Sequence, residues 1–467
     1  LTEVQPSASA GPTWDQFNQT VQRLEAEIRE LKEQRIQSSE RTDGLAPMSE
    51  NPASTDAVQP VGHEATCLRQ ACTNCSSNCA DCGKQICEGL PHVCGICLEK
   101  LSWNKSGGWK IVPFGMLRGE MIYAQQEQAA DAVIFFLGPE NPGVDDDQFT
   151  AHAKTSMLNF AFTGPNIGSW ETGGAIVMNF TGSQPLRNTS GPQILNAFGE
   201  VKNDDWRFAF GRMFDLFSPI TPSTVNMGQQ RGAGNVGIYR GAMQVDRYIN
   251  VSTDTRWTLS GRLSQPVVND FLILPTARGQ DSGIPNFEGR IGLELGPERD
   301  GHRTLEIGIS GLWGETLAFD PAFLFDAGGE TVLAPPAQNV STTAGGSIDF
   351  QLHGQRFGFR SEFWAAQAAG TYFVAALQTL NPATGDGIRS IGGWGEVYCR
   401  PNDCTTCYLG YGIDDPRNQD LGFQTDPVDP EDPGQRTLNQ VAWATMLWDV
   451  TDFFQLGFEV SHRKTDY

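Results

Sequence analysis

The chain has 467 residues, of which 39% are hydrophobic, with a mean hydropathy of −0.33 and a formal net charge of −22. No stretch approaches the roughly 18 uninterrupted apolar residues that a membrane-spanning helix requires, so a helical membrane protein is excluded. The acidic balance argues against nucleic acid as a partner, because phosphate binding calls for a basic face and the sequence shows none.

The N-terminal part divides into regions of different composition. Residues 1–13 show no pattern and are expected to be disordered. Residues 14–38 predict a coiled-coil helix, because apolar residues at alternating spacings of three and four are flanked by charges; they are Trp14, Phe17, Val21, Leu24, Ile28 and Leu31. A single amphipathic helix packed on its own domain is the alternative. Residues 39–66, rich in Ser, Pro, Thr and Gln, predict a flexible linker.

Residues 67–100 predict a small cysteine-rich module. Its eight cysteines are Cys67, Cys72, Cys75, Cys79, Cys82, Cys87, Cys94 and Cys97. Three pairs have the C-x-x-C spacing of paired zinc ligands. In an exported chain we favour disulfides over a metal, because a segment with so few apolar residues has almost no core. Cys399, Cys404 and Cys407 bracket a later turn, and the odd total of 11 leaves at least one thiol unpaired within the chain.

From Trp109 to Tyr467 the chain repeats runs of about ten residues that are apolar at every second position. In Trp206–Gly211 the aromatic residues take one face, and in Phe287–Leu295 the apolar residues lie opposite Glu and Arg. Residues 101–467 therefore predict an all-β fold. A transmembrane antiparallel β-barrel has an apolar outside and a polar, often charged, interior. A soluble β-sandwich lectin or adhesin is the alternative, because alternation alone does not separate the two.

Fifteen strands can be marked in this region. They start near Trp109, Lys154, Trp170, Pro192, Trp206, Ile238, Arg256, Asn286, Arg303, Asn339, Gln355, Arg389, Thr406, Thr437 and Phe453. Bacterial barrels usually close with an even number, so about sixteen strands are expected. The remaining strand would lie beyond the end of the sequence or in Ala132–Leu137. A barrel of that size leaves an aqueous channel.

The alternation lapses over residues 213–237, between the fifth and sixth strands. A connection this long and this hydrophobic is unusual for a solvent loop. We expect it to fold into the barrel and narrow the pore, with its apolar residues packed on the wall.

Two segments carry a family resemblance. Phe214–Thr224 (FDLFSPITPST) resembles the segment after an early strand of DcaP-like outer-membrane porins, and Ser156–Gly164 (SMLNFAFTG) is similar to one of their early strands. The resemblance spans about Trp109 to Tyr467 and implies a homotrimer with a periplasmic coiled coil that passes small, often anionic, organic solutes. The cysteine cluster departs from the family pattern, and Gly410–Pro416 resembles segments of porin-like proteins from planctomycetes.

The inward face of the predicted barrel carries charges that are candidates for solute selection. The candidate pore-lining residues are Arg207, Arg212, Asp215, Arg240, Arg256, Arg262, Arg290 and Arg360. Guanidinium groups in a confined pore attract carboxylates and phosphates, and we expect Arg207, Arg212 and Arg240 to form a basic constriction. Inward carboxylates give the alternative, in which cations and anions pair and brace the wall; these are Glu288, Glu294, Glu306, Glu362 and Glu459.

The sequence thus predicts a porin in the bacterial outer membrane, in contact with lipid, with its N-terminal region in the periplasm. A removed signal peptide is the favoured explanation for a chain that begins at Leu1, and a fragment is the other. The alternative function is a structural protein that tethers the outer membrane to the cell wall through residues 14–97. We expect neither a cofactor nor an enzyme, because the histidines are scattered; they are His63, His92, His152, His302, His353 and His462.

Overall fold

The computed structural model describes most of the chain after residue 102. The described ranges are 103–105, 108–128, 133–139, 146–182, 190–266, 277–278, 282–298, 302–319, 338–381, 384–422, 435–451 and 453–467. The predicted disordered terminus, coiled coil, linker and cysteine-rich module lie outside these residues.

Strands make up most of the described residues and nearly all of their regular secondary structure. The strands of the first half are β1 (Trp103–Lys105), β2 (Trp109–Met116), β3 (Glu120–Ala124), β4 (Gln148–His152), β5 (Met157–Thr163), β6 (Glu171–Asn179), β7 (Gln193–Lys202), β8 (Trp206–Phe214), β9 (Tyr239–Ser252) and β10 (Thr255–Ser264). Those of the second half are β11 (Ala277–Arg278), β12 (Asn286–Leu295), β13 (Leu305–Phe319), β14 (Gln338–His353), β15 (Phe357–Gln367), β16 (Arg389–Asn402), β17 (Thr405–Pro416), β18 (Leu438–Thr451) and β19 (Phe454–Asp466).

Three short 3-10 helices complete the described elements: η5 (Gly370–Tyr372), η6 (Ala375–Leu377) and η7 (Asn418–Asp420). In the part of the chain that the structure describes, no helix has the length and apolar character needed to cross a membrane.

Strands that follow one another in the chain are paired antiparallel, from β2 to β5 and onward through β10, β12 and β13 to β19. Strand β1 adds to β2, and β11 pairs with β13, which makes a 17-stranded sheet. Strands β3 and β4 form a separate hairpin. Antiparallel neighbours need no crossover connection, which is why strands adjacent in the chain are also adjacent in the sheet.

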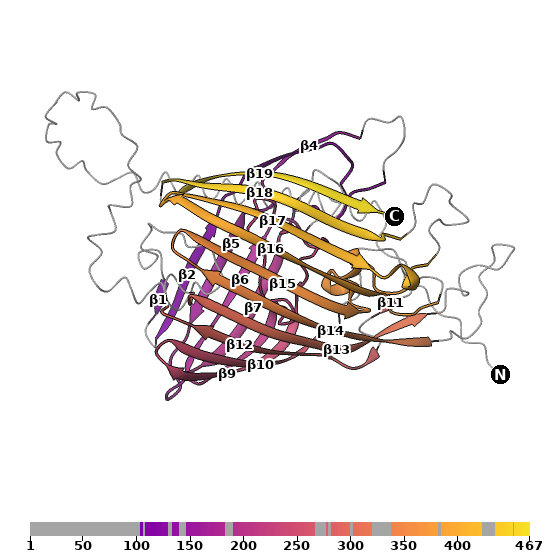
Figure 1. Cartoon of the computed structure of the whole chain (residues 1–467). Coiled ribbons are helices and arrows are strands. Elements are labelled where there is room, and N and C mark those ends of the chain that lie inside the picture. The colour runs from indigo at the N-terminus through magenta and orange to yellow at the C-terminus, as the bar shows by residue number, and fades with distance from the viewer. Residues whose placement is uncertain are drawn as a thin grey trace, which may run out of the picture. The chain divides into compact units, whose positions relative to one another are not determined.

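The two ends of the sheet differ in their connections. At one end, here called the short-turn end, neighbouring strands are joined by a few residues, as between β9 and β10 or β16 and β17. At the other, the long-loop end, connections such as 180–192, 215–238 and 368–388 are much longer. Figure 1 shows the early strands, in purple and magenta, crossing behind the late strands, in orange and yellow.

The predicted strand starts agree with the structure to within three residues, from Trp109 at β2 to Phe453 at β19. The estimate of about sixteen strands is close to the seventeen of the large sheet, but the additional strands are the short β1 and β11. The suggested strand at Ala132–Leu137 is wrong. Its described residues form only an isolated bridge between Gln128 and Leu137.

The two faces of the sheet have opposite character, as the alternation predicts. One face, here called the outer face, exposes large apolar side chains; examples are Phe208, Phe210, Ile291, Ile309, Phe363 and Leu409, which are 41–69% exposed. The other, the inner face, carries polar and charged residues that are mostly buried, such as Asp246, Glu288 and Asp349. A soluble sandwich would bury its apolar face instead.

Residues 133–138 are hydrogen-bonded to the C-terminal end of the chain. The backbone N–H of Leu137 donates to Thr465 Oγ1 at 3.0 Å, and Tyr467 donates its hydroxyl to Leu137 O at 2.6 Å. Arg463 donates to Phe135 O at 2.6 Å. A segment that follows β3 thus packs against β19, the last strand.

Candidate functional site

The segment between β8 and β9, residues 215–238, is hydrogen-bonded to inner-face side chains from strands spread over the sheet. Ser347 on β14 donates to Phe217 O at 2.5 Å, and Trp364 on β15 donates its indole N–H to Gly234 O at 2.7 Å. Asn439 on β18 donates to Gly232 O at 2.6 Å. These side chains all lie on the inner face, and they come from strands that are not all neighbours. The segment that they contact therefore packs on the inner face.

Three inner-face glutamates hold the backbone of the segment. Glu288 on β12 accepts the N–H of Leu216 at 2.7 Å, and Glu396 on β16 accepts that of Ser223 at 2.9 Å. Glu459 on β19 accepts the N–H of Val225 at 2.5 Å. Because hydrogen bonds to a carboxylate are stronger than neutral ones, these contacts anchor a loop that has no regular secondary structure of its own.

A second segment, residues 368–388, packs against the first. The N–H of Gly237 donates to Tyr372 O at 2.8 Å, and the Phe217 and Tyr372 rings meet edge to face at 6.0 Å. Val374, Ala375 and Ala376 are fully buried. Small residues are frequent after β15, but the sequence contains no signal that this loop is buried against the 215–238 segment.

Both segments contain strained backbone. Among the described residues, positive φ angles outside glycine occur only there, at Gln229, Gln230, Ala368, Phe373, Ala375, Ala376 and Leu377. Each such conformation costs on the order of 1–3 kcal/mol and persists only where the surroundings impose it. Concentrations of this kind are typical of functional regions.

A buried charge cluster joins the two segments to the wall. Arg240 on β9 and Asp215 are fully buried, with Nε to Oδ1 at 2.6 Å and Nη2 to Oδ2 at 3.0 Å. The guanidinium lies 3.6 Å from the centre of the Tyr372 ring and donates to Thr371 O. Arg262 lies 3.8 Å from both Asp215 and Glu288. The hydrogen bonds from Arg240 offset part of the loss of hydration that burial imposes on Asp215. Arg262 Nη1, in contrast, has no hydrogen-bond partner among the described residues.

The structure pairs most of the predicted arginines with carboxylates. The pairs of Arg240 and Arg262 are described above. Arg207 donates to Glu200 at 2.6 Å and to Asp246 at 3.0 Å. The remaining pairs are Arg256 with Glu294 at 2.8 Å, Arg290 with Asp349 at 2.7 Å and Arg360 with Glu396 at 2.6 Å. Ion pairing between neighbouring strands, one of the two alternatives drawn from the sequence, is therefore present at Arg207, Arg256 and Arg360. Arg290 instead pairs across the intervening strand β13.

Arg212 differs from the other predicted arginines. Its register partner on β9 is Gly241, two residues before Met243, which is 57% exposed on the outer face. Arg212 therefore lies on the strand side that faces outward. The guanidinium donates to the backbone oxygen of Ile194 at 3.0 Å. Arg207, Arg212 and Arg240, expected together at a basic constriction, therefore have different partners: carboxylates for Arg207 and Arg240, and a backbone oxygen for Arg212.

Two arginines that the sequence did not single out lie at the inserted segment. Arg231, within the segment, donates Nε to Gly237 O at 3.0 Å. Arg463 on β19 donates to Phe135 O and to Gln230 Oε1, both at 2.6 Å. Neutral oxygens rather than carboxylates accept these bonds. Arg231 lies within the lapse of alternation, which is its only sequence signal, whereas the sequence contains no signal for Arg463 on β19.

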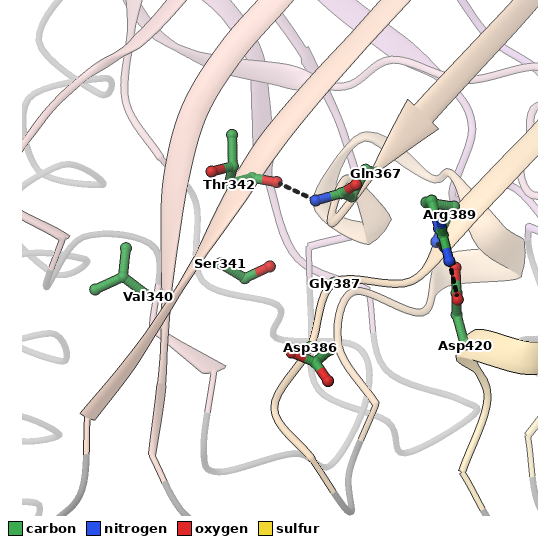
Figure 2. A pocket seen from close by; sticks show the side chains of 8 residues that line it. All are labelled: Val340, Ser341, Thr342, Gln367, Asp386, Gly387, Arg389 and Asp420. Carbon is green, nitrogen blue, oxygen red and sulfur yellow. Dashed lines mark hydrogen bonds and ion pairs between the residues drawn. The ribbon is translucent and has the colours of Figure 1, made fainter.

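A shallow pocket of about 380 Å³ opens near the long-loop end, between β14, the end of β15 and the start of β16 (Figure 2). Arg389 and Asp420 face each other across two hydrogen bonds of 2.6 and 2.5 Å, and the amide of Gln367 donates to Thr342 O. The bonds from Arg389 hold the pKa of the Asp420 carboxyl below its ordinary value. The pocket lies apart from the inserted segment.

The cysteines and the possible metal ligands lie in different parts of the chain. The eight cysteines proposed for disulfides or metal lie outside the described residues. Cys404 is disulfide-bonded, whereas Cys399 and Cys407, directly opposite each other on β16 and β17, are free thiols. Within the described ranges, His302, Glu306 and His353 bring possible metal-ligand atoms within 4.8 Å of one another.

Comparison with known proteins supports the fold. No protein-family model matches the sequence, and no curated protein matches it significantly. The outer membrane channel DcaP of Acinetobacter baumannii matches with a TM-score of 0.58 at 15% identity, covering 78% of this chain and 93% of that chain. OmpT of Vibrio cholerae matches with a TM-score of 0.47 at 10% identity, covering 78% and 89%.

An anion-selective porin from Comamonas acidovorans matches with a TM-score of 0.46 at 8% identity, covering 77% of this chain and 90% of that chain. The DcaP match confirms at the level of the fold the resemblance found in the sequence, since it spans almost the whole of that channel. The chain therefore has the fold of an outer-membrane channel similar to DcaP.

Proposed function

We propose that the chain is an outer-membrane porin that forms a water-filled channel for small, anionic, hydrophilic solutes, with residues 213–237 as its constriction. The observation that carries this proposal is the set of hydrogen bonds between the inserted segment and the inner-face side chains of β12, β14, β15, β16, β18 and β19. A segment held from so many strands would occupy the cross-section of a channel and set its width.

The outer face suits a lipid environment. Its exposed side chains are apolar along the strands, and Trp206, Trp257, Trp313 and Trp448 are 37–47% exposed. An apolar band with aromatic residues is what a barrel presents to the bilayer. We propose the bacterial outer membrane as the location and its lipid as a partner.

Solute selection would depend on which arginine side chains have a positive charge that no neighbouring carboxylate balances. Arg207 and Arg240 are each matched by carboxylates, so they contribute little net positive potential. Arg231 and Arg463 donate to neutral oxygens beside the inserted segment. Guanidinium groups held in this way attract carboxylate or phosphate groups in a confined pore. We therefore place the proposed basic constriction at Arg231 and Arg463, and not at Arg212, whose register is in phase with the outer face.

We further propose a homotrimer, as the family resemblance implies, and an N-terminal region in the periplasm. Strand β2 begins at the short-turn end, where Lys110 is paired with Thr163. Short turns lie on the periplasmic side of bacterial barrels. We propose neither an enzymatic activity nor a cofactor, because a porin acts by diffusion.

Conductance in a planar bilayer under a salt gradient tests the proposal. The expected reversal potential indicates anion preference, and Arg463→Gln reduces that preference because a charge beside the inserted segment is lost. Arg247→Gln is the matched control, since Arg247 lies on β9 and pairs with the exposed Asp205 away from the inserted segment. Cation preference in the unsubstituted protein would contradict anion selection, and absence of any conductance would contradict the porin.

A further inference from the structure

Three side chains capable of binding a transition metal meet at the short-turn end of the sheet. His302 lies just before β13, Glu306 is the second residue of β13, and His353 is the last residue of β14. The nearest possible ligand atoms of all three lie within 4.8 Å of one another. They take no part in the contacts of the inserted segment.

The pairing of β13 with β14 brings these residues together. Glu306 is the register partner of Gln351, and the N–H of His353 donates to Thr304 O at 2.8 Å. The rings of His302 and His353 are stacked, with centroids 4.4 Å apart and planes 19° apart. Two connections that are separate in the sequence therefore present two imidazoles to one carboxylate.

The carboxylate of Glu306 is held in place by its neighbours. Its Oε1 accepts the backbone N–H of Arg303 at 3.0 Å, and its Oε2 accepts the side-chain amide of Gln351 at 3.0 Å. His302 Nδ1 lies 3.4 Å from Oε1. Hydrogen bonds of this kind orient metal ligands and are a regular feature of built metal sites.

One imidazole nitrogen lacks a partner. His353 Nε2 is buried and accepts or donates no hydrogen bond among the described residues. Burial of a polar atom without a partner is costly, so each instance in a native protein calls for an explanation. A metal ion bound to this nitrogen would provide one.

We propose that His302, Glu306 and His353 form a Zn²⁺ site. Two imidazole nitrogens and one carboxylate oxygen are the three protein ligands of open zinc sites, in which water occupies the fourth position. Nitrogen donors favour zinc over calcium or magnesium, which take oxygen ligands. Tetrahedral zinc requires ligand atoms roughly 3.3 Å apart. The His302 side chain is 54% exposed and has room to rotate toward the other two ligands.

A bound ion would link the connection before β13 to the turn between β14 and β15. Because the unfolded chain does not bring these residues together, zinc would favour the folded state and raise the unfolding temperature. This role is independent of whether the inner face conducts solutes.

Zinc binding by the full chain in detergent tests the site. The chain is first treated with a chelator and then titrated with Zn²⁺ by calorimetry. The unsubstituted protein is expected to bind one more equivalent than the double variant Glu306→Gln/His353→Gln, or to bind it more than about 100-fold more tightly. His462→Gln is the matched control, because this exposed histidine lies on β19 away from the cluster. It is expected to bind like the unsubstituted protein.

Cysteine thiolates also bind zinc, and residues 67–97 contain eight cysteines. The test therefore compares zinc binding between variants and does not rely on the total number of zinc ions bound by one protein. The difference between the Co²⁺ spectra of the unsubstituted protein and the double variant is expected to show d–d absorption without thiolate charge-transfer bands. Equal binding by the two proteins, or a difference spectrum dominated by thiolate bands, overturns the site. Should the double variant misfold, His302→Gln decides alone, because its exposed side chain can be replaced without disturbing the core.

Discussion

At the scale of single residues, most arginines on the inner face of the described strands lie beside a carboxylate. The alternation of apolar and charged residues indicates which side chains point inward, but the partner of each depends on strand register. Arg290 meets Asp349, which lies two strands away along the sheet, because the intervening residue on β13 is Gly308. A side chain at that glycine would occupy the space of both charged groups. The spacing of residues within one strand contains no such information.

Replacing Arg240 should be the most destabilising change among these pairs. Arg240→Met leaves the buried carboxylate of Asp215 without its bidentate partner, and loss of one member of a buried pair costs about 3–5 kcal/mol. Arg247→Met is the control, since its pair with Asp205 is partly exposed and contributes less than about 1 kcal/mol. Urea unfolding of both variants in the same lipid measures the difference. Equal losses would show that the Arg240 pair adds nothing beyond a surface pair.

The Arg389–Asp420 pair predicts a dependence on pH. Hydrogen bonds from Arg389 lower the pKa of Asp420, so the contribution of this pair to stability is complete above the ordinary aspartate pKa of about 3.9. It is lost as the pH falls through the lowered value. The difference in unfolding free energy between the unsubstituted protein and Asp420→Asn should therefore stay constant from neutral pH to about pH 4 and shrink below it.

The matched control for this pH profile is Asp403→Asn. The Asp403 side chain is 71% exposed and lies 3.7 Å from Arg356, so little change in stability is expected at any pH. A difference for Asp420→Asn that persists unchanged into strong acid would contradict the ion-pair explanation.

At the scale of elements, the strands follow from local pattern and the inserted segments do not. The lapse of alternation after β8 is visible in the sequence, and its hydrophobic content predicts burial. The burial of Phe217, Val236 and Ala233 agrees with that prediction. The loop after β15 is different, since its alanines and glycine resemble an ordinary exposed connection. Its burial involves both the first segment, through Phe217 and Val236, and the wall, through Leu312 and Trp364, which form one apolar cluster with Tyr372.

Gly234 offers a direct test of how the 215–238 segment is seated. Its φ is +104°, and an added Cβ would lie 2.2 Å from Gly393 O and 2.7 Å from the backbone nitrogen of Ile413. Gly234→Ala should therefore push the segment away from β16 and β17, with a cost of about 2 kcal/mol or more. In the proposed channel, this displacement appears as altered single-channel conductance and increased current noise.

Gly261→Ala is the control for that measurement. Gly261 lies in β10, and an added Cβ would meet no atom within 4 Å. Conductance and stability should be nearly unchanged. If Gly234→Ala conducts like Gly261→Ala while retaining its stability, the segment is not seated as described.

At the scale of the whole molecule, the apolar outer face and the polar inner face favour the proposed membrane channel over a soluble β-sandwich. The second hypothesis is a tether between the outer membrane and the cell wall. It concerns the N-terminal region, residues 14–97, and not the sheet. Deletion of residues 1–100 separates the two roles. We expect solute flux to be retained, because the sheet is built from residues after 102. Loss of envelope attachment in the same variant would support an anchor joined to a porin.

A shorter deletion of residues 1–66 keeps the eight cysteines and serves as the comparison. If both deletions leave the envelope unchanged, the tether hypothesis is wrong. If only the longer deletion detaches it, the cysteine-rich region rather than the predicted coiled coil is responsible. Light microscopy of envelope separation, together with uptake of a small anionic solute, measures the two roles independently.

The sequence by itself determined where the strands begin, which face of the sheet is apolar and which connection is abnormal. These properties are local, because side chains alternate within a strand whatever its neighbours are. Only the tertiary structure decided which carboxylate meets which arginine and how the inserted segments are held. The bond between Ser223 and Glu396 joins residues 173 positions apart, and that between Asn439 and Gly232 joins residues 207 apart. Contacts of such separation depend on the register of every strand between them, which no local pattern specifies.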